Sequence, residues 1–243
     1  MVYTKDLKVA GDMDEAIRSV SFSVESGEFV CIVGPSGSGK TTLLKLLASI
    51  NKPTGGTIKI NGNVGIVFQE PVLLPWRTVL DNVLLPVELR YDKKDYLSRA
   101  YQLLNLVGLS GQYNRYPYQL SGGMQQRVAI CRALIYNAPI LLMDEPFSAL
   151  DAMLREQLNL EILRIWKELK LTVVFVTHNL QEAVFLSDKI IALSGHPATV
   201  KANFDVTLPR PRKLNIINTE SFGAHVAALR EILGVGKYEE DDE

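Results

Sequence analysis

Short runs of apolar residues, rich in valine and isoleucine, alternate along the chain with longer segments of helical periodicity. The clearest runs are FVCIV at 29–33, VGIVF at 64–68, PILLM at 139–143, LTVVFV at 171–176 and KIIAL at 189–193. Their almost continuous hydrophobicity is typical of strands that are covered on both faces. We therefore predict an α/β fold with a buried sheet.

The pattern becomes purely helical between residues 76 and 137, where VLDNVLLPVELR and DYLSRAYQLLNLVGL show no strand alternation. We expect an α-helical subdomain at 76–137, inserted into an α/β core made of residues 1–75 and 138–200. The remaining residues, 201–243, contain the extended LPRPRKLN and the helix-like SFGAHVAALREIL, and end in the acidic KYEEDDE, which we expect to be solvated. They are too few for another sizeable domain, so we predict one domain with a C-terminal tail.

Composition narrows the class of protein. The chain has 243 residues, 47% of them hydrophobic and 22% charged, and a net charge of −1, which gives no bulk attraction to nucleic acid. It has no run of about 18–20 apolar residues that could span a bilayer and no secretory signal at its start. We expect an intracellular protein whose cysteines, Cys31 and Cys131, are buried free thiols.

The segment GPSGSGKT matches the phosphate-loop pattern G-x-x-x-x-G-K-[ST] at every defined position, between an apolar strand and a helix. Its glycines let backbone amides converge on a phosphate, Lys40 would reach the β- and γ-phosphates, and the Thr41 hydroxyl would ligate Mg²⁺. A glycine-rich turn with an incidental lysine is the alternative, and the strand–loop–helix context disfavours it. The predicted phosphate-binding residues are Gly34, Pro35, Ser36, Gly37, Ser38, Gly39, Lys40, Thr41 and Thr42.

An acidic pair, Asp144 and Glu145, follows the apolar run ILLM. Ligands of open α/β sheets bind at the carboxyl ends of the strands, so we expect this pair to face the phosphate loop. Adjacent strand residues point in opposite directions, which allows two roles. Asp144 suits a Mg²⁺ site, and Glu145 suits polarising a water molecule that attacks the γ-phosphate. A polar stop to a strand is the alternative.

Two further polar residues end predicted strands: Gln69 after VGIVF and His178 after VVFVT. A glutamine or a lone histidine in such a place is more often structural than catalytic. Because these strands end where the nucleotide is expected, we predict that Gln69 reaches Mg²⁺ or the attacking water and that His178 is catalytic. His196 and His225 have no such context.

The ordered set GPSGSGKTT, VFQ, LSGGMQQR, ILLMDEP, SALD and VTH resembles the ATPase subunits of ATP-binding cassette transporters, over about residues 5–195. LSGGMQQR at 120–127 is similar to the signature of that family. The resemblance implies a P-loop NTPase core of the RecA-like type, with a mostly parallel sheet and a small antiparallel β region. It also implies binding of ATP and Mg²⁺ and hydrolysis of ATP. It also implies nucleotide-binding roles for Ser121, Gly122, Gly123, Gln125 and Asp151.

The resemblance further implies a head-to-tail dimer, a homodimer or a paired cassette, in which each ATP lies between one chain's phosphate loop and the other chain's signature. Ser121 and the amides of Gly122 and Gly123 would then meet the γ-phosphate held by the partner. Asp151 would lie near the dimer axis. This arrangement would explain why one chain carries two anion-binding segments.

Two positions depart from the family pattern. The aromatic residue that commonly stacks on adenine is absent near Gly11, and the nearest is Tyr3, so Met13 and Ile17 are alternatives and the adenine contact stays unassigned. Asn179 stands where an aspartate commonly follows the histidine.

LLPWRTVLDNV, MDEPFSALDAMLR and LPRPR look most like the branch that imports nitrate, sulfonates and taurine. The implied partners are an integral membrane permease, docked near Trp76, and indirectly an extracytoplasmic solute-binding protein, with the chain peripheral at the cytoplasmic face. A core-packing role for the Trp76 segment is the alternative. For the whole chain, a soluble mechanochemical ATPase on ribosomes or DNA is a second hypothesis, and an unrelated P-loop kinase is a third.

Overall fold

The computed structural model describes residues 1–10, 15–88 and 91–234, and these divide into two compact units. The phosphate-loop unit consists of residues 2–23, 29–59 and the chain from Val176 onward. The signature unit consists of Met1, Val24–Glu28 and Ile60–Phe175. Gly11 and Met13, which bear on the adenine contact, and the acidic end KYEEDDE lie outside the described residues.

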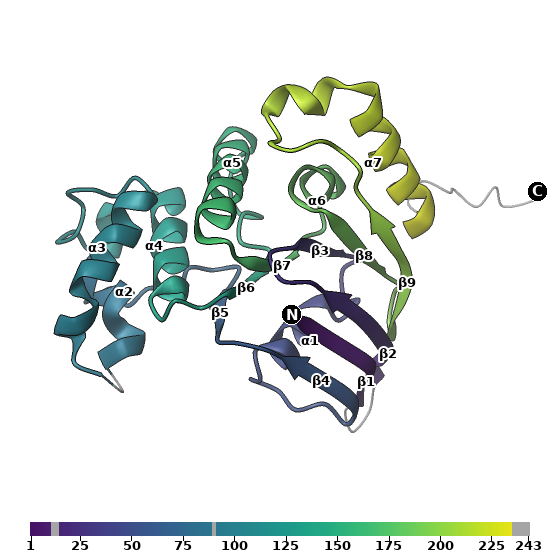
Figure 1. The fold of residues 1–243 in the computed structure, drawn as a ribbon, viewed down its shortest axis with the longest axis horizontal. Helices are drawn as coiled ribbons and strands as arrows, with labels where there is room; N and C mark the ends of the chain where they lie inside the picture. Colours follow the sequence, from purple (N-terminus) through teal and green to yellow (C-terminus); the bar gives the residue numbers. More distant parts are fainter. Residues whose placement is uncertain (11–14, 89–90, 235–243) are drawn as a thin grey trace, which may run out of the picture. The chain divides into compact units, whose positions relative to one another are not determined.

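The phosphate-loop unit contains most of the sheet. Its β3 pairs in parallel with β8, from Val30 opposite Lys189 to Val33 opposite Ala192, and β8 pairs with β9 in antiparallel fashion. In sheet order its strands are β4 (Gly55–Ile60), β1 (Val2–Ala10), β2 (Glu15–Val24), β9 (Ala198–Asp205), β8 (Lys189–Leu193) and β3 (Phe29–Val33). Its helices are α1 (Lys40–Leu47), α6 (Leu180–Leu186), η3 (Leu214–Asn218) and α7 (Glu220–Leu233). Figure 1 shows α6 beside α7, and α7 also packs on β8 and β9.

The signature unit combines a few strands with a group of helices. Strands β5 and β6 pair in parallel, and α2, α3 and α4 pack together as a helical group (Figure 1). In sheet order the strands are β7 (Thr172–Val176), β6 (Ile140–Asp144) and β5 (Val64–Val67). The helices are α2 (Val79–Glu88), η1 (Lys93–Tyr96), α3 (Leu97–Leu106), η2 (Pro117–Gln119), α4 (Gly122–Leu134) and α5 (Ala152–Leu169).

The predicted α/β class and the five predicted strands are confirmed, with ends that differ by at most one residue. Every residue of β3, β6 and β7 is buried, as continuous apolar runs should be. Helix α1 stops at Leu47, six residues before Pro53, so the proline is not what ends it. There Ser49 adopts a φ of 57°, and the amide of Ile50 donates to the carbonyl of Lys45 at 2.9 Å, which closes the last turn early.

Strand β9 spans Ala198–Asp205 and so crosses residue 200, where the α/β core was expected to end. The chain after β9 continues into α7. Both cysteines are free and buried, as predicted. Burial in apolar surroundings raises the pKa of each thiol, Cys31 and Cys131, far above its ordinary value. Within the described residues, none of the helices combines the length and the apolar character that a membrane span requires.

Candidate nucleotide-binding and hydrolytic site

The phosphate loop connects β3 to α1 in the phosphate-loop unit. Gly37 and Gly39 have φ values of 77° and 79°, which glycine adopts without strain. A Cβ atom on Gly39 would lie 3.1 Å from the carbonyl oxygen of Ala16, and one on Gly34 would lie 2.8 Å from Ser38 Oγ. The loop therefore needs glycine for its backbone conformation and for its close approach to neighbouring atoms.

Lys40 lies over this loop with an exposed fraction of only 6%. Its Nζ donates to the carbonyl oxygens of Gly34 at 2.9 Å and Pro35 at 2.8 Å. The N-cap of α1 is Gly39, which has no side chain to cap the first turn. A helix start capped by glycine, with an ammonium group beside it, is suited to binding a phosphate, which is a stronger acceptor for the ammonium than a neutral carbonyl.

The structure brings His178 to the same end of the sheet as this loop. The amide of Thr177 donates to the carbonyl of Ile32 at 3.2 Å, two residues before the loop begins at Gly34. His178 follows directly and is exposed. Asn179 then caps α6, its Oδ1 accepting from the amides of Gln181 and Glu182. An asparagine therefore serves as an effective N-cap here.

In the signature unit, the parallel register of β5 and β6 brings Gln69 and the acidic pair together. Gln69 Nε2 donates to Ser148 Oγ at 3.3 Å, and Ser148 Oγ donates to the carbonyl oxygen of Glu145 at 2.9 Å. Asp144 is 7% exposed. Glu145 has a φ of 43°, a left-handed conformation that is uncommon for a non-glycine residue. Such strain concentrates at functional sites.

Ser121 is the N-cap of α4, where its Oγ accepts from the amide of Met124 at 3.3 Å. A Cβ atom on Gly123 would lie 3.0 Å from side-chain carbons of Leu154, and one on Gly122 would lie 3.4 Å from Leu150. The signature glycines thus allow close packing against the segment that starts α5, and Ser121 stays exposed at the start of its helix.

Gln125 points back into its own subdomain, since its Nε2 donates to the carbonyl oxygens of Pro117 at 3.0 Å and Leu120 at 3.3 Å. The last residue of the signature, Arg127, forms an ion pair with Glu161 of α5 at 2.8 Å. The Gln125 bonds fix the chain that leads into α4, and the Arg127 ion pair stabilises the packing of α4 against α5.

Asp151 is the exposed N-cap of α5, and its Oδ1 accepts from the amide of Leu154 at 3.0 Å. The loop before it is organised by Arg155, whose guanidinium donates to the carbonyl oxygens of Phe147 at 3.2 Å and Leu150 at 2.8 Å. Neither Arg155 nor Ser148 is among the site residues predicted from the sequence. Ser148 is the first residue of the SALD motif, but its bond to Gln69 spans 79 positions and no local pattern marks it.

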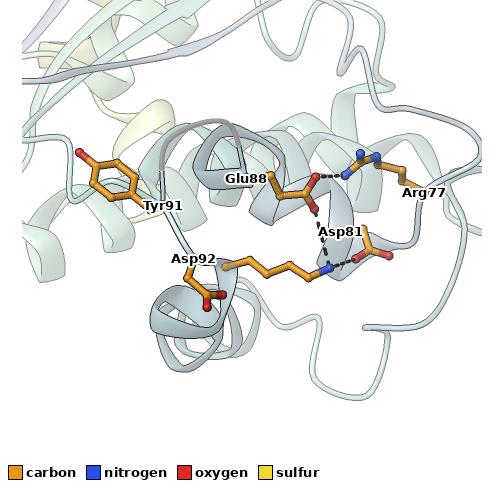
Figure 2. A pocket seen from close by; sticks show the side chains of 6 residues that line it. Arg77, Asp81, Glu88, Tyr91 and Asp92 are labelled. Carbon is orange, nitrogen blue, oxygen red and sulfur yellow. Dashed lines mark hydrogen bonds and ion pairs between the residues drawn. The ribbon is translucent and has the colours of Figure 1, made fainter.

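A groove in the helical part of the signature unit lies apart from the predicted nucleotide residues (Figure 2). Arg77 and Glu88 form an ion pair at 2.5 Å there, and Lys93 Nζ lies 4.0 Å from carboxylate oxygens of both Asp81 and Glu88. Figure 2 shows the carboxylate of Glu88 turned toward the guanidinium of Arg77. The groove is lined by Arg77, Asp81, Glu88, Tyr91, Asp92 and Lys93.

Comparison with known proteins places these motifs in a family. The family model described as "ABC transporter" matches residues 17–148. An aliphatic sulfonates import ATP-binding protein of Shouchella clausii is 44% identical over 221 residues, which cover 90% of this chain and 86% of that protein. A nitrate import ATP-binding protein of Synechocystis is 41% identical, with 80% and 76% covered.

Solved structures agree with the sequence comparison. The ABC transporter cassette MJ0796, determined as a dimer, matches with a TM-score of 0.75 and 34% identity, over 86% of this chain and all of the cassette. A second dimeric structure of that cassette, in a post-hydrolysis state with ADP and Pi, matches with a TM-score of 0.74. The predicted P-loop NTPase core is confirmed, and the chain belongs to the ABC transporter family as an ATP-binding subunit that hydrolyses ATP.

Proposed function

We propose that this chain couples ATP-driven closure of a cassette dimer to the import of a small solute, of the nitrate, sulfonate or taurine class, through a membrane permease. The names of its relatives support an import role, and the dimeric structures of a similar cassette support association of two copies. A soluble ATPase acting on ribosomes or DNA is not favoured, since the net charge is −1 and these relatives are import proteins.

The residues present fit an ATP–Mg²⁺ complex. Lys40 and the glycine-capped start of α1 would hold the phosphates, within the loop from Gly34 to Thr42. The Thr41 hydroxyl, the Gln69 amide oxygen and the Asp144 carboxylate are hard oxygen donors of the kind that Mg²⁺ prefers. When bound, Mg²⁺ supplies charge that stabilises the phosphoryl group as it is transferred.

For hydrolysis, we assign Glu145 to polarising the attacking water, Gln69 to orienting that water, and His178 to contacting the transferred phosphoryl group. The bonds that join Gln69 to Glu145 through Ser148 support a shared task for the first two. A general base held in place contributes about 10²–10⁴-fold to a rate. Replacing any one of these groups should therefore lower the turnover rate measurably.

The observation that carries the dimer proposal is the exposed start of α4. Ser121 caps that helix at the surface of a chain that already has a complete phosphate loop of its own. A second anion-binding segment is useful when it meets the nucleotide of another copy. In this proposal Ser121, Gly122, Gly123 and Asp151 face the partner's ATP. Gln125 supports them through its bonds to the chain that enters α4.

The Glu145→Gln variant tests this mechanism. It keeps the size and the hydrogen-bonding ability of the side chain but removes the carboxylate base. We expect ATP to bind normally, turnover to fall by about 10²-fold or more, and ATP to trap a dimer. Size-exclusion chromatography with and without ATP measures the dimer, and the Lys40→Ala variant, which should stay monomeric, is the control. A Glu145→Gln protein that is monomeric with ATP, or that keeps full turnover, would contradict the proposal.

The permease is proposed to dock on the exposed apolar segment after Gln69. Val72 is 60% exposed and Trp76 is 71% exposed, unusual for such large apolar side chains. Arg132 of α4 donates to the carbonyl oxygens of Pro71 and Val72, so the segment is tied to the signature helix. Docking there would keep the chain at the cytoplasmic face of the membrane. The solute-binding protein would act from the other side, through the permease.

A further inference from the structure

Helix α6 is only seven residues long and begins two residues after His178. Isolated helices of this length are unstable in water, because the cost of the first turn is not recovered. Its place in the molecule must therefore come from contacts made at its two ends and on its buried face.

The C-terminal end of α6 is held by two arginines of the segment LPRPR at 208–212. The last carbonyl groups of a helix have no partner within the helix. Here Arg212 Nη1 donates to the carbonyl oxygens of Val184 at 3.0 Å, Phe185 at 2.9 Å and Ser187 at 2.6 Å. Arg210 Nη2 donates to the remaining one, Leu186, at 2.7 Å. Two guanidinium groups thus satisfy four consecutive carbonyls.

Arg210 also connects α6 to the strand that leads into the phosphate loop. Arg210 Nε forms an ion pair with Asp188 Oδ1 at 2.7 Å, and Asp188 Oδ2 accepts from the amide of Phe29, the first residue of β3, at 3.0 Å. Strand β3 also packs against α6. The end of α6 is therefore fixed relative to the strand that carries the loop.

The N-terminal end of α6 is tied to the residues on both sides of His178. Thr177 Oγ1 donates to Glu182 Oε2 at 2.5 Å and accepts from the amide of Asn179 at 3.0 Å. Asn179 in turn caps the helix through the amides of Gln181 and Glu182. A shift of α6 would consequently move Thr177 and Asn179, and His178 with them.

Arg212 is placed to act as a charged cap. It is 5% exposed, and burial lowers its pKa to about 10, so the guanidinium stays protonated at neutral pH. Positive charge at the C-terminal end of a helix is favourable. Loss of the guanidinium would leave buried carbonyls without their donor, which is costly in a protein interior.

We propose that Arg212, assisted by Arg210, is a positioning residue for His178: it holds the C-terminal end of α6 and thereby fixes the segment from Thr177 to Asn179. The segment LPRPR, which in the sequence is only a mark of the importer branch, thus serves ATP hydrolysis from a distance. The inference rests on the proposed role of His178 in hydrolysis.

The test compares the full-length chain with its Arg212→Gln, Arg212→Lys and Arg210→Gln variants. We expect turnover to fall by about 10- to 100-fold in Arg212→Gln, because small displacements of a catalytic group cost rates of this size, with the dissociation constant for ATP unchanged within twofold. Arg212→Lys, which keeps the charge, should recover part of the loss, and Arg210→Gln should lose less. Arg230→Gln, an exposed arginine of α7, is the matched control.

A second measurement follows His178 directly. The chain has three histidines, so ¹³C-labelled histidine gives few ring resonances to assign. We expect the Arg212 and Arg210 variants to shift or broaden the resonance of His178 and to leave that of His196 unchanged. If Arg212→Gln does not fold, Arg212→Lys and Arg210→Gln carry the test.

Unchanged turnover together with an unchanged His178 resonance, even with a lower melting temperature, would overturn the inference and leave Arg212 a purely structural anchor. His178→Ala in the same series separates the two proposals. If His178→Ala keeps full turnover, the catalytic role of His178 fails, and the resonance still decides whether Arg212 positions it.

Discussion

At the scale of single residues, a glycine outside the recognised motifs can have as little space for a side chain as a glycine within them. Gly65 lies in β5, in a strand pattern that gave no reason to single it out. A Cβ atom there would lie 2.3 Å from the carbonyl oxygen of Ala133 in α4, which is far inside van der Waals contact. The close packing of the signature helix on β5 therefore depends on this position.

We expect Gly65→Ala to destabilise the protein by about 1–3 kcal/mol, because backbone atoms would have to move apart. Gly223→Ala is the matched control. Gly223 lies within α7, nothing would lie within 4 Å of its added Cβ, and alanine there should stabilise the helix by up to about 1 kcal/mol. Thermal unfolding followed by circular dichroism measures both. Equal effects of the two substitutions would show that the predicted clash is absorbed without cost.

At the scale of elements, irregular segments are shaped by side chains reaching back from the next helix. Asn82 in α2 is completely buried, and its amide makes a full set of bonds to the preceding segment. Its Oδ1 accepts from the amide of Leu74 at 2.8 Å, and its Nδ2 donates to the carbonyl oxygens of Leu74, Arg77 and Thr78. The segment so held includes Trp76, which we propose as part of the permease contact.

Asn82→Ala should destabilise the protein by about 2–4 kcal/mol, since it leaves several buried polar groups without partners. It should also raise hydrogen exchange across residues 74–78 and reduce co-purification of a multi-span membrane protein. Asn218→Ala, at an exposed position, is the control. Normal exchange at 74–78 in Asn82→Ala would refute the role of this amide, and intact membrane association would count against docking at Trp76.

At the scale of the whole molecule, the predicted site residues are divided between the two units. The phosphate loop and His178 belong to one, and Gln69, Asp144, Glu145 and the signature belong to the other. Within each group, hydrogen bonds connect the predicted residues or the segments that carry them. A functional nucleotide site of the proposed dimer would draw on both groups and on two chains.

Mixing two inactive variants tests this sharing. Ser121→Phe blocks the signature, and Lys40→Ala removes the charge that holds the phosphates, so we expect neither variant alone to form an ATP-dependent dimer. An equal mixture contains pairs in which one intact loop meets one intact signature, and these should dimerise with ATP. Sizing of each variant and of the mixture measures this. A mixture that behaves as the sum of its parts would argue against sites shared between chains.

The sequence by itself determined the α/β class, the phosphate loop, the acidic pair and the signature. These are local features, in which a few consecutive residues set both the backbone conformation and the chemistry, as in the glycines and Lys40 of residues 34–41. The five strands were predictable for the same reason, since continuous burial leaves a continuous apolar run.

The tertiary structure alone decided which distant side chains hold these motifs in place. Ser148 reaches Gln69 across 79 positions, Arg212 reaches Val184 across 28, and Gly65 meets Ala133 of the signature helix. Serine, arginine and glycine occur at many surface positions with no such task, and the motifs SALD and LPRPR do not indicate which distant residue Ser148 or Arg212 contacts. Their roles arise because folding buries carbonyl and amide groups that must find partners, and the fold decides which side chain is near enough to supply them.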